Sequence, residues 1–124
     1  MRYDLVIDTD ECYSGNNTPQ SPPPMGLLAA CHSAGDTRLQ NCLAFYSLSK
    51  RSNAPGMRSG FVAGDAHLIK KFLQYRTYHG CTLSLPVQAA SIAAWSDEEH
   101  VIENRTLYQE KFTAVLEVLK DALP

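Results

Sequence analysis

Two short apolar segments, each ending in residues that can do chemistry, most constrain the fold of this chain. The first, residues 3–9, leads into Asp10, and the second, residues 42–48, leads into Lys50. Continuous apolar runs of this kind are typical of strands that are buried on both faces in a parallel sheet. Open α/β sheets bind ligands at the carboxyl ends of their strands. The sequence therefore predicts an α/β fold with a site where these two segments end.

The remaining chain alternates turn signals with helical patterns. Pro-rich residues 14–24 predict a loop, and Asp65 is expected to cap the helix that follows it. Ser96, with Glu99 three residues later, predicts the start of a long final helix. The expected elements are a third strand over residues 60–64 and helices over 25–34, 66–78, 86–95 and from about 97 to the end. These elements indicate a three-layer α/β/α arrangement around a mostly parallel sheet.

Three strands make a small sheet for so much helix. Parallel strands that are buried on both faces need neighbours on either side. The pattern therefore favours the middle of a larger domain. A small α/β domain that stands alone, with one sheet edge exposed, is the alternative.

Composition excludes several classes of function. Eleven Lys and Arg against thirteen Asp and Glu leave no basic excess for nucleic acid. No apolar run approaches the roughly 20 residues that cross a bilayer. The four cysteines contain no Cys-x-x-Cys pair and the histidines are scattered, so we expect no metal site. We also expect the cysteines to be free thiols in a reducing cytoplasm. Cys12 has no histidine placed to activate it and is interpreted as a buried or neutral thiol.

The segment around Lys50 carries the most specific chemical signal. Lysine is the side chain that forms Schiff bases with carbonyl compounds. Arg58 follows eight residues later, and its guanidinium fork suits a phosphate group. The hydroxyls of Ser47 and Ser49, just before Lys50, add further hydrogen-bond donors.

These residues together resemble a known family. The run from Ser47 to Lys50, followed by Ala-Pro-Gly-x-Arg-x-Gly-Phe at residues 54–61, is similar to the cofactor-lysine segment of class I and II (fold-type I) pyridoxal-phosphate aminotransferases. Asp10 and Tyr13 resemble the Asp-x-x-Tyr segment of that family. Residues 49–65 look most like the N-succinyldiaminopimelate aminotransferase branch. The resemblance extends over the whole chain.

The resemblance implies a cofactor and a role for each matched residue. Lys50 would bind pyridoxal 5'-phosphate covalently and then move the proton of the reaction. Asp10 would pair with the pyridine nitrogen, and Tyr13 would hydrogen-bond the 3-oxygen of the ring. The residues that would hold the phosphate are Ser47 and Arg58, with Ser49 beside the lysine as an additional candidate.

The resemblance also implies an activity and a domain plan. The enzyme would move an amino group between an amino acid and a 2-oxo acid; in the branch, these are N-succinyl-LL-2,6-diaminopimelate and 2-oxoglutarate, in lysine biosynthesis. A cytoplasmic homodimer is expected. Residues 1–96 would be part of the cofactor-binding large domain, and 97–124 a long helix leading toward a small domain. Family members are much longer, so the 124 residues resemble a fragment that we expect to be inactive alone. The alternatives are a carbon-sulfur lyase of the same fold and a non-catalytic fragment.

Overall fold

The computed structural model describes residues 4–17, 22–80, 82–120 and 122. Strands β1 (Ile7–Asp10), β2 (Cys42–Ser47) and β3 (Gly60–Gly64) form one sheet in the order β1-β2-β3. β1 and β2 are parallel, as expected, whereas β3 is antiparallel to β2, so the sheet is mixed. β3 reverses direction because the segment that joins it to β2 turns back at the same edge of the sheet. That segment holds only the short helix α2 (Leu48–Arg51) and the 3-10 turn Pro55–Met57.

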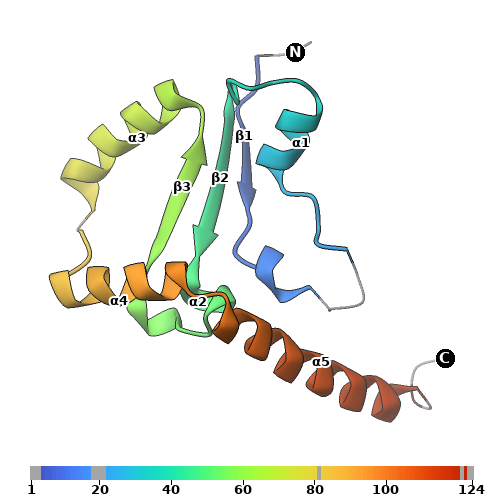
Figure 1. Ribbon diagram of the computed structural model, residues 1–124. Coiled ribbons are helices and arrows are strands. Elements are labelled where there is room, and N and C mark those ends of the chain that lie inside the picture. Colours follow the sequence, from blue (N-terminus) through green and yellow to red (C-terminus); the bar gives the residue numbers. More distant parts are fainter. Residues whose placement is uncertain (1–3, 18–21, 81, 121, 123–124) are drawn as a thin grey trace.

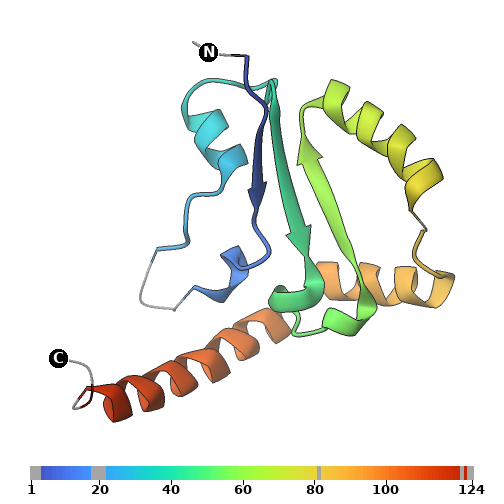
Figure 2. The same cartoon turned by 180° about the vertical axis from the view of Figure 1, so that it is seen from behind.

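Helices cover opposite faces of the sheet (Figures 1 and 2). Helix α1 (Leu27–Ser33) brings Cys31 against Cys42 of β2, with the two sulfurs 3.5 Å apart. Helix α3 (Ala66–His79) brings Phe72 against Phe45 of β2, with ring centroids 6.0 Å apart. Residues 42 and 45 are an odd number of positions apart, so they point to opposite faces of the strand. The expected three-layer α/β/α arrangement is therefore confirmed.

Two further helices lie at the end of the sheet where β1 and β2 finish. Helix α4 (Leu85–Ser96) crosses this end, and its Trp95 ring packs edge-on against Phe61 of β3 at 4.9 Å. Helix α5 (Glu99–Leu119) then runs away from the sheet (Figure 1). Large apolar side chains of this helix stay exposed, with Phe112 and Val115 about half accessible to solvent.

In the described part of the chain, no helix combines the length and apolar character needed to cross a membrane.

One predicted helix cap is confirmed and one is wrong. The Asp65 carboxylate accepts hydrogen bonds from the backbone N–H groups of His67 and Leu68, which fixes the start of α3. Ser96 ends α4 instead of capping α5. Asp97 takes its place, because its Oδ1 accepts a hydrogen bond from the backbone N–H of Glu99 at 2.9 Å.

The buried core follows β2 into α2 and includes one residue of α5. Among the described residues, the fully buried apolar side chains are Cys42, Ala44, Leu48 and Val101. The first apolar segment is different: Val6, just before β1, is 53% exposed and Ile7 of β1 is 41% exposed, so the expectation of burial on both faces is wrong for this chain. The reason is the strand order, which puts β1 at an edge of the described sheet.

Candidate active site

The carboxyl ends of β1 and β2 lie side by side, as the sequence predicts. Asp10, the last residue of β1, is opposite Phe45 in the parallel pair. Ser47 ends β2 two residues later, and Lys50 follows within α2. Because the strands run in the same direction, residues that follow them emerge at the same edge of the sheet.

Lys50 and Tyr13 are in direct contact. The Lys50 Nζ lies 5.2 Å from the centre of the Tyr13 ring, within the range of a cation–π interaction. Tyr13 is 64% exposed and directly precedes a short 3-10 turn, Ser14–Asn16. The structure therefore brings together two residues that are 37 positions apart in the sequence.

Asp10 presents a charged carboxylate at the same edge. Hydrogen bonds from the Cys12 side chain and then from its backbone N–H, which is 2.9 Å from Oδ1, hold the pKa of Asp10 below its ordinary value. Asp10 is therefore ionised at neutral pH, and it is exposed. Burial, and next the hydrogen bond to Asp10, raise the pKa of Cys12 to about 11. Cys12 is thus half-buried and neutral, which confirms its interpretation as an unactivated thiol.

Ser47 and Ser49 form a polar pair at the start of α2. The Ser47 Oγ accepts a hydrogen bond from the Ser49 backbone N–H at 3.0 Å and lies 2.8 Å from the Ser49 Oγ. The Ser47 hydroxyl also lies 3.3 Å from the carbonyl oxygen of Ser59, a buried residue. Both hydroxyls are therefore held in place within one helical turn of Lys50.

Arg58 lies at the turn before β3. Its backbone is left-handed, with φ at 52°, and its guanidinium Nη1 donates a hydrogen bond to the Pro55 carbonyl at 2.8 Å. The residue is exposed and lies two positions before Gly60, which pairs with Ser47 across the sheet. Within the described residues, no hydrogen bond joins Arg58 to the other predicted site residues.

A set of tethers that sequence reasoning missed fastens α2 to the corner between α4 and α5. Arg51 forms an ion pair with Glu98 and donates a hydrogen bond to the Ala94 carbonyl at 3.0 Å. Its guanidinium also lies 5.1 Å from the centre of the Trp95 ring. Arg51, the residue after Lys50, therefore contacts three residues of this corner.

α5 adds two tethers from consecutive turns of one helix face. The Nε2 atom of His100 lies 2.8 Å from the Ser52 Oγ, and its Nδ1 atom lies 2.8 Å from the Asp97 Oδ2. Asn104 donates a hydrogen bond to the Lys50 carbonyl at 3.3 Å. The sequence analysis treated His100 only as one of the scattered histidines and gave it no partner. The sequence feature that could have indicated these contacts is the four-residue spacing of the polar residues 100 and 104, which places both on one helix face.

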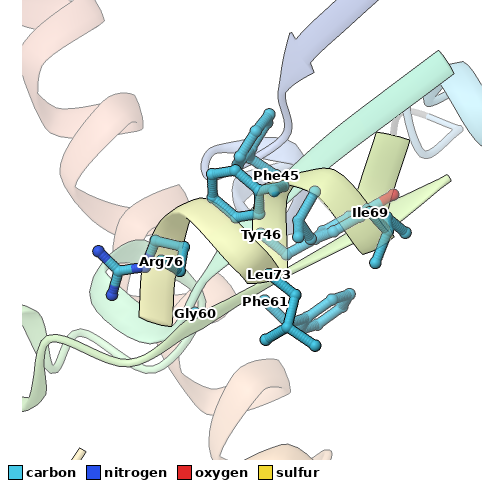
Figure 3. A pocket seen from close by; sticks show the side chains of 9 residues that line it. Phe45, Tyr46, Gly60, Phe61, Ile69, Leu73 and Arg76 are labelled. Atoms are coloured by element: carbon cyan, nitrogen blue, oxygen red, sulfur yellow. The ribbon is translucent and has the colours of Figure 1, made fainter. Parts of the chain in front are cut away.

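Two cavities flank this region. One of about 540 Å³ lies beside the site, with Ser47, Cys12, Arg51 and Trp95 among its walls. The other, of about 430 Å³, lies under α3 and is walled by apolar side chains of β2, β3 and α3, with Arg76 at one end (Figure 3). Lys50 lines neither cavity. In the described ranges, no three His, Cys, Asp or Glu side chains cluster as metal ligands.

The assembled groups suit a phosphorylated aldehyde with a basic ring nitrogen. An amine can attack the aldehyde carbon, and an ionised carboxylate can hold a proton on the ring nitrogen. Hydroxyl groups and a guanidinium are suitable phosphate ligands. The arrangement therefore fits pyridoxal 5'-phosphate, although Arg58 would have to turn from Pro55 toward Ser47 to share the phosphate.

Comparison with known proteins identifies related sequences and structures. A family model described as aminotransferase class I and II matches residues 2–123. The crystal structure of an aminotransferase from Neisseria meningitidis superimposes with a TM-score of 0.89, at 57% identity over 97% of this chain and 30% of that one. The 4-dedimethylamino-4-oxo-anhydrotetracycline transaminase OxyQ of Streptomyces rimosus is 40% identical over 83% of this chain and 28% of its own length. An LL-diaminopimelate aminotransferase of Aquifex aeolicus is 31% identical over 95% of this chain and 29% of its own length.

These three relatives are all much longer proteins. The chain spans less than a third of the length of each.

Proposed function

The chain belongs to the class I and II aminotransferase family, and on that basis we propose that its protein transfers an amino group between an amino acid and a 2-oxo acid. The observation that carries the proposal is the Lys50–Tyr13 contact at the shared carboxyl edge of β1 and β2, next to the ionised carboxylate of Asp10. An amine, a phenol and a charged carboxylate at one sheet edge are the groups that pyridoxal 5'-phosphate requires. When bound, this cofactor supplies an electron sink for the bonding electrons of the substrate Cα.

Lys50 has two tasks in this proposal. Its Nζ would bind the aldehyde carbon of the cofactor, and the free Lys50 amine would take the Cα proton of the substrate and give a proton back to complete the 1,3-proton shift. Both tasks need the amine at a fixed position. The tethers from Arg51 and Asn104 support this, because they hold the backbone of the short helix that carries Lys50.

Asp10 and Tyr13 act on the ring. The ionised Asp10 carboxylate holds a proton on the pyridine nitrogen, because a negative charge in contact favours the charged form of its partner. The Tyr13 hydroxyl would donate a hydrogen bond to the 3-oxygen of the ring. The phosphate is held by Ser47, Ser49 and Arg58.

For the substrate, we propose the diaminopimelate class, with N-succinyl-LL-2,6-diaminopimelate as amino donor and 2-oxoglutarate as acceptor. Two observations support this class: the resemblance of residues 49–65 to that branch, and a relative named for LL-diaminopimelate. Another relative is named for a tetracycline intermediate, so the donor must be decided by assay.

The proposed assembly is that of a longer enzyme. Residues 1–96 form part of the cofactor-binding domain, and α5 leads toward a smaller domain. The functional unit is a cytoplasmic homodimer. Residues 1–124 by themselves bind the cofactor weakly or not at all, because Ser47, Ser49 and Arg58 can satisfy only part of a doubly charged phosphate.

A panel assay on the full-length protein tests the proposal. Purified protein loaded with pyridoxal 5'-phosphate is given N-succinyl-LL-2,6-diaminopimelate, LL-diaminopimelate or common amino acids with 2-oxoglutarate, and glutamate formation is followed. Lys50→Ala should abolish transfer, whereas Lys70→Ala, at an exposed position of α3, should leave it unchanged. Release of pyruvate and a thiol from a cysteine conjugate, without glutamate formation, would support a carbon-sulfur lyase instead.

A further inference from the structure

Two cysteines lie in contact on the α1 face of the sheet, at the opposite end of β2 from Lys50. Cys31 of α1 donates its thiol hydrogen to the sulfur of Cys42, 3.5 Å away. The Cys42 thiol donates in turn to the Gln40 carbonyl at 3.4 Å. Both cysteines are free, so the structure places two reduced sulfurs within van der Waals contact.

The two thiols differ in access to solvent. Cys42 is 1% exposed, and burial, followed by the Cys31 hydrogen bond, raises its pKa to about 11. Cys31 lies on a surface helix and is only half-buried. A dissolved oxidant therefore reaches the Cys31 sulfur first, and the Cys42 sulfur lies buried in contact with it.

Cys12 serves as an internal comparison. It is also half-buried, and its thiol contacts Asp10 and Ser47. A carboxylate and a hydroxyl cannot displace oxygen from an oxidised sulfur to make a disulfide, whereas a second thiol can.

We propose that Cys31 and Cys42 form an oxidisable dithiol, a modification site that takes hydrogen peroxide as its oxidant and closes to a disulfide between α1 and β2. Cys31 sulfur attacks the peroxide, the O–O bond breaks, an S–O bond forms and water leaves. Cys42 sulfur then attacks Cys31, the S–O bond breaks, the S–S bond forms and a second water leaves with the Cys42 proton. Two thiols are oxidised and one peroxide is reduced to two waters.

The position of the pair predicts what the bond does. Cys42 begins β2 and Ser47 ends it, so the disulfide lies about five strand residues, roughly 16 Å, from the candidate active site. α1 is otherwise held at its start by the Leu27 backbone N–H, which donates to the Glu11 carboxylate. A disulfide adds a covalent link near the end of α1 and restricts the unfolded chain. Oxidation should therefore raise the melting temperature and leave cofactor binding at Lys50 unchanged.

The test must separate Cys31 from Cys12, because trypsin leaves both on the peptide spanning residues 3–38, while Cys42 is on the peptide 39–50. The full chain carrying Cys12→Ser is therefore treated with hydrogen peroxide under native conditions and digested without reduction. We expect a cross-linked pair of these two peptides, a mass loss of about 2 Da and recovery of both thiols with dithiothreitol.

Three outcomes would overturn the proposal. One is Cys31 accumulating as sulfinic acid without a cross-link; another is peptide 39–50 joined to the peptide that carries Cys81. The third is a cross-link that forms in wild-type protein and is lost in Cys12→Ser. Because the linkage is read in Cys12→Ser itself, the result does not depend on whether a Cys31 variant folds. Cys31→Ser, where it folds, should lose both the cross-link and the rise in melting temperature.

Discussion

The turn that carries Lys50 and the face of the sheet under α3 are built in different ways. Around Lys50, the core residue Leu48 is completely buried, Asn104 of α5 donates a hydrogen bond to the Lys50 carbonyl, and the Arg51 side chain donates one to the Ala94 carbonyl of α4. Under α3, the apolar side chains enclose a cavity of about 430 Å³, and Leu73 on its wall is 66% exposed.

This contrast indicates which parts of the site the 124 residues can organise by themselves. The turn that carries Lys50 is fixed by two contacts within the described chain. Ser47 accepts a hydrogen bond from the Ser49 backbone, and Asn104 donates one to the Lys50 carbonyl. The α3 face keeps apolar surface open, and the relatives have more than three times the matched length. We therefore expect the lysine turn to be sensitive to single substitutions and the α3 face to tolerate them in the 124-residue chain.

The largest expected effect is on turnover at the lysine edge. Asp10→Asn should lower kcat of the full-length enzyme about 100-fold or more, because an amide carries no charge to hold the ring proton. Asp8→Asn is the matched control, since Asp8 is exposed on the same face of β1 and should retain activity. Steady-state kinetics with saturating cofactor measure both. Wild-type turnover in Asp10→Asn would show that another residue meets the ring nitrogen.

A pair of leucine substitutions compares the two regions in stability. Leu48→Ala should cost about 2–5 kcal/mol of unfolding free energy, because it empties a fully buried position next to Ser49 and Lys50. Leu73→Ala on the α3 face should cost less than about 0.5 kcal/mol. Urea denaturation of the 124-residue chain gives both values. Equal losses would mean that the α3 face is covered, for example by self-association, and the comparison would fail.

Two glycines test how closely β3 approaches β2. Gly64 has φ at +145°, and a Cβ there would lie 2.0 Å from the Cys42 carbonyl oxygen, so Gly64→Ala should cost more than about 1 kcal/mol. A Cβ at Gly56 meets nothing within 4 Å, so Gly56→Ala should change stability by less than about 0.5 kcal/mol. Thermal melts of the two variants compare them directly. A larger loss at Gly56 would contradict the described approach of β3 to β2.

Acid sensitivity is the smallest expected effect. The His100 hydrogen bond, and next that of the Glu99 backbone, lower the pKa of Asp97 from 3.8; backbone hydrogen bonds from Asn41 and then Leu68 lower that of Asp65. A lowered folded-state pKa contributes stability that is present above pH 3.8 and is lost as the pH falls through the lower value.

The melting temperature should therefore drop on acidification from about pH 4 to about pH 2. Asp97→Asn should flatten this drop at the α5 tether, and Asp65→Asn at the start of α3. Melts across the pH range measure the slopes. A melting temperature that rises on acidification in this range would contradict the assigned hydrogen bonds.

The parts of the fold set by local patterns could be predicted from the sequence. The segment 60–64 forms β3 at the expected residues, and Asp65 caps α3 because its carboxylate reaches the next backbone N–H groups. The Ser96 cap failed because two adjacent polar residues compete for one helix start, and Asp97 has the better geometry.

Long-range contacts could not be predicted in the same way. The helix-start pattern of Ser96 and Glu99 does not reveal that His100 contacts Ser52, 48 positions away, or that Arg51 pairs with Glu98. The direction of β3 was also missed, since its short apolar run is compatible with either orientation. For the site, the two strand ends placed Asp10 and Lys50 at one edge, and the family resemblance added Tyr13. The side-chain direction of Arg58 could not be predicted, because it is set by a left-handed turn.

Chemical mapping of the modified lysine shows whether Lys50 is the residue that binds the cofactor. The full-length protein is loaded with pyridoxal 5'-phosphate, reduced with borohydride and digested, and the pyridoxyl group is located by mass spectrometry. We predict modification of Lys50. Modification of Lys70 or Lys71 on α3 instead, with Lys50 unmodified, would contradict this assignment.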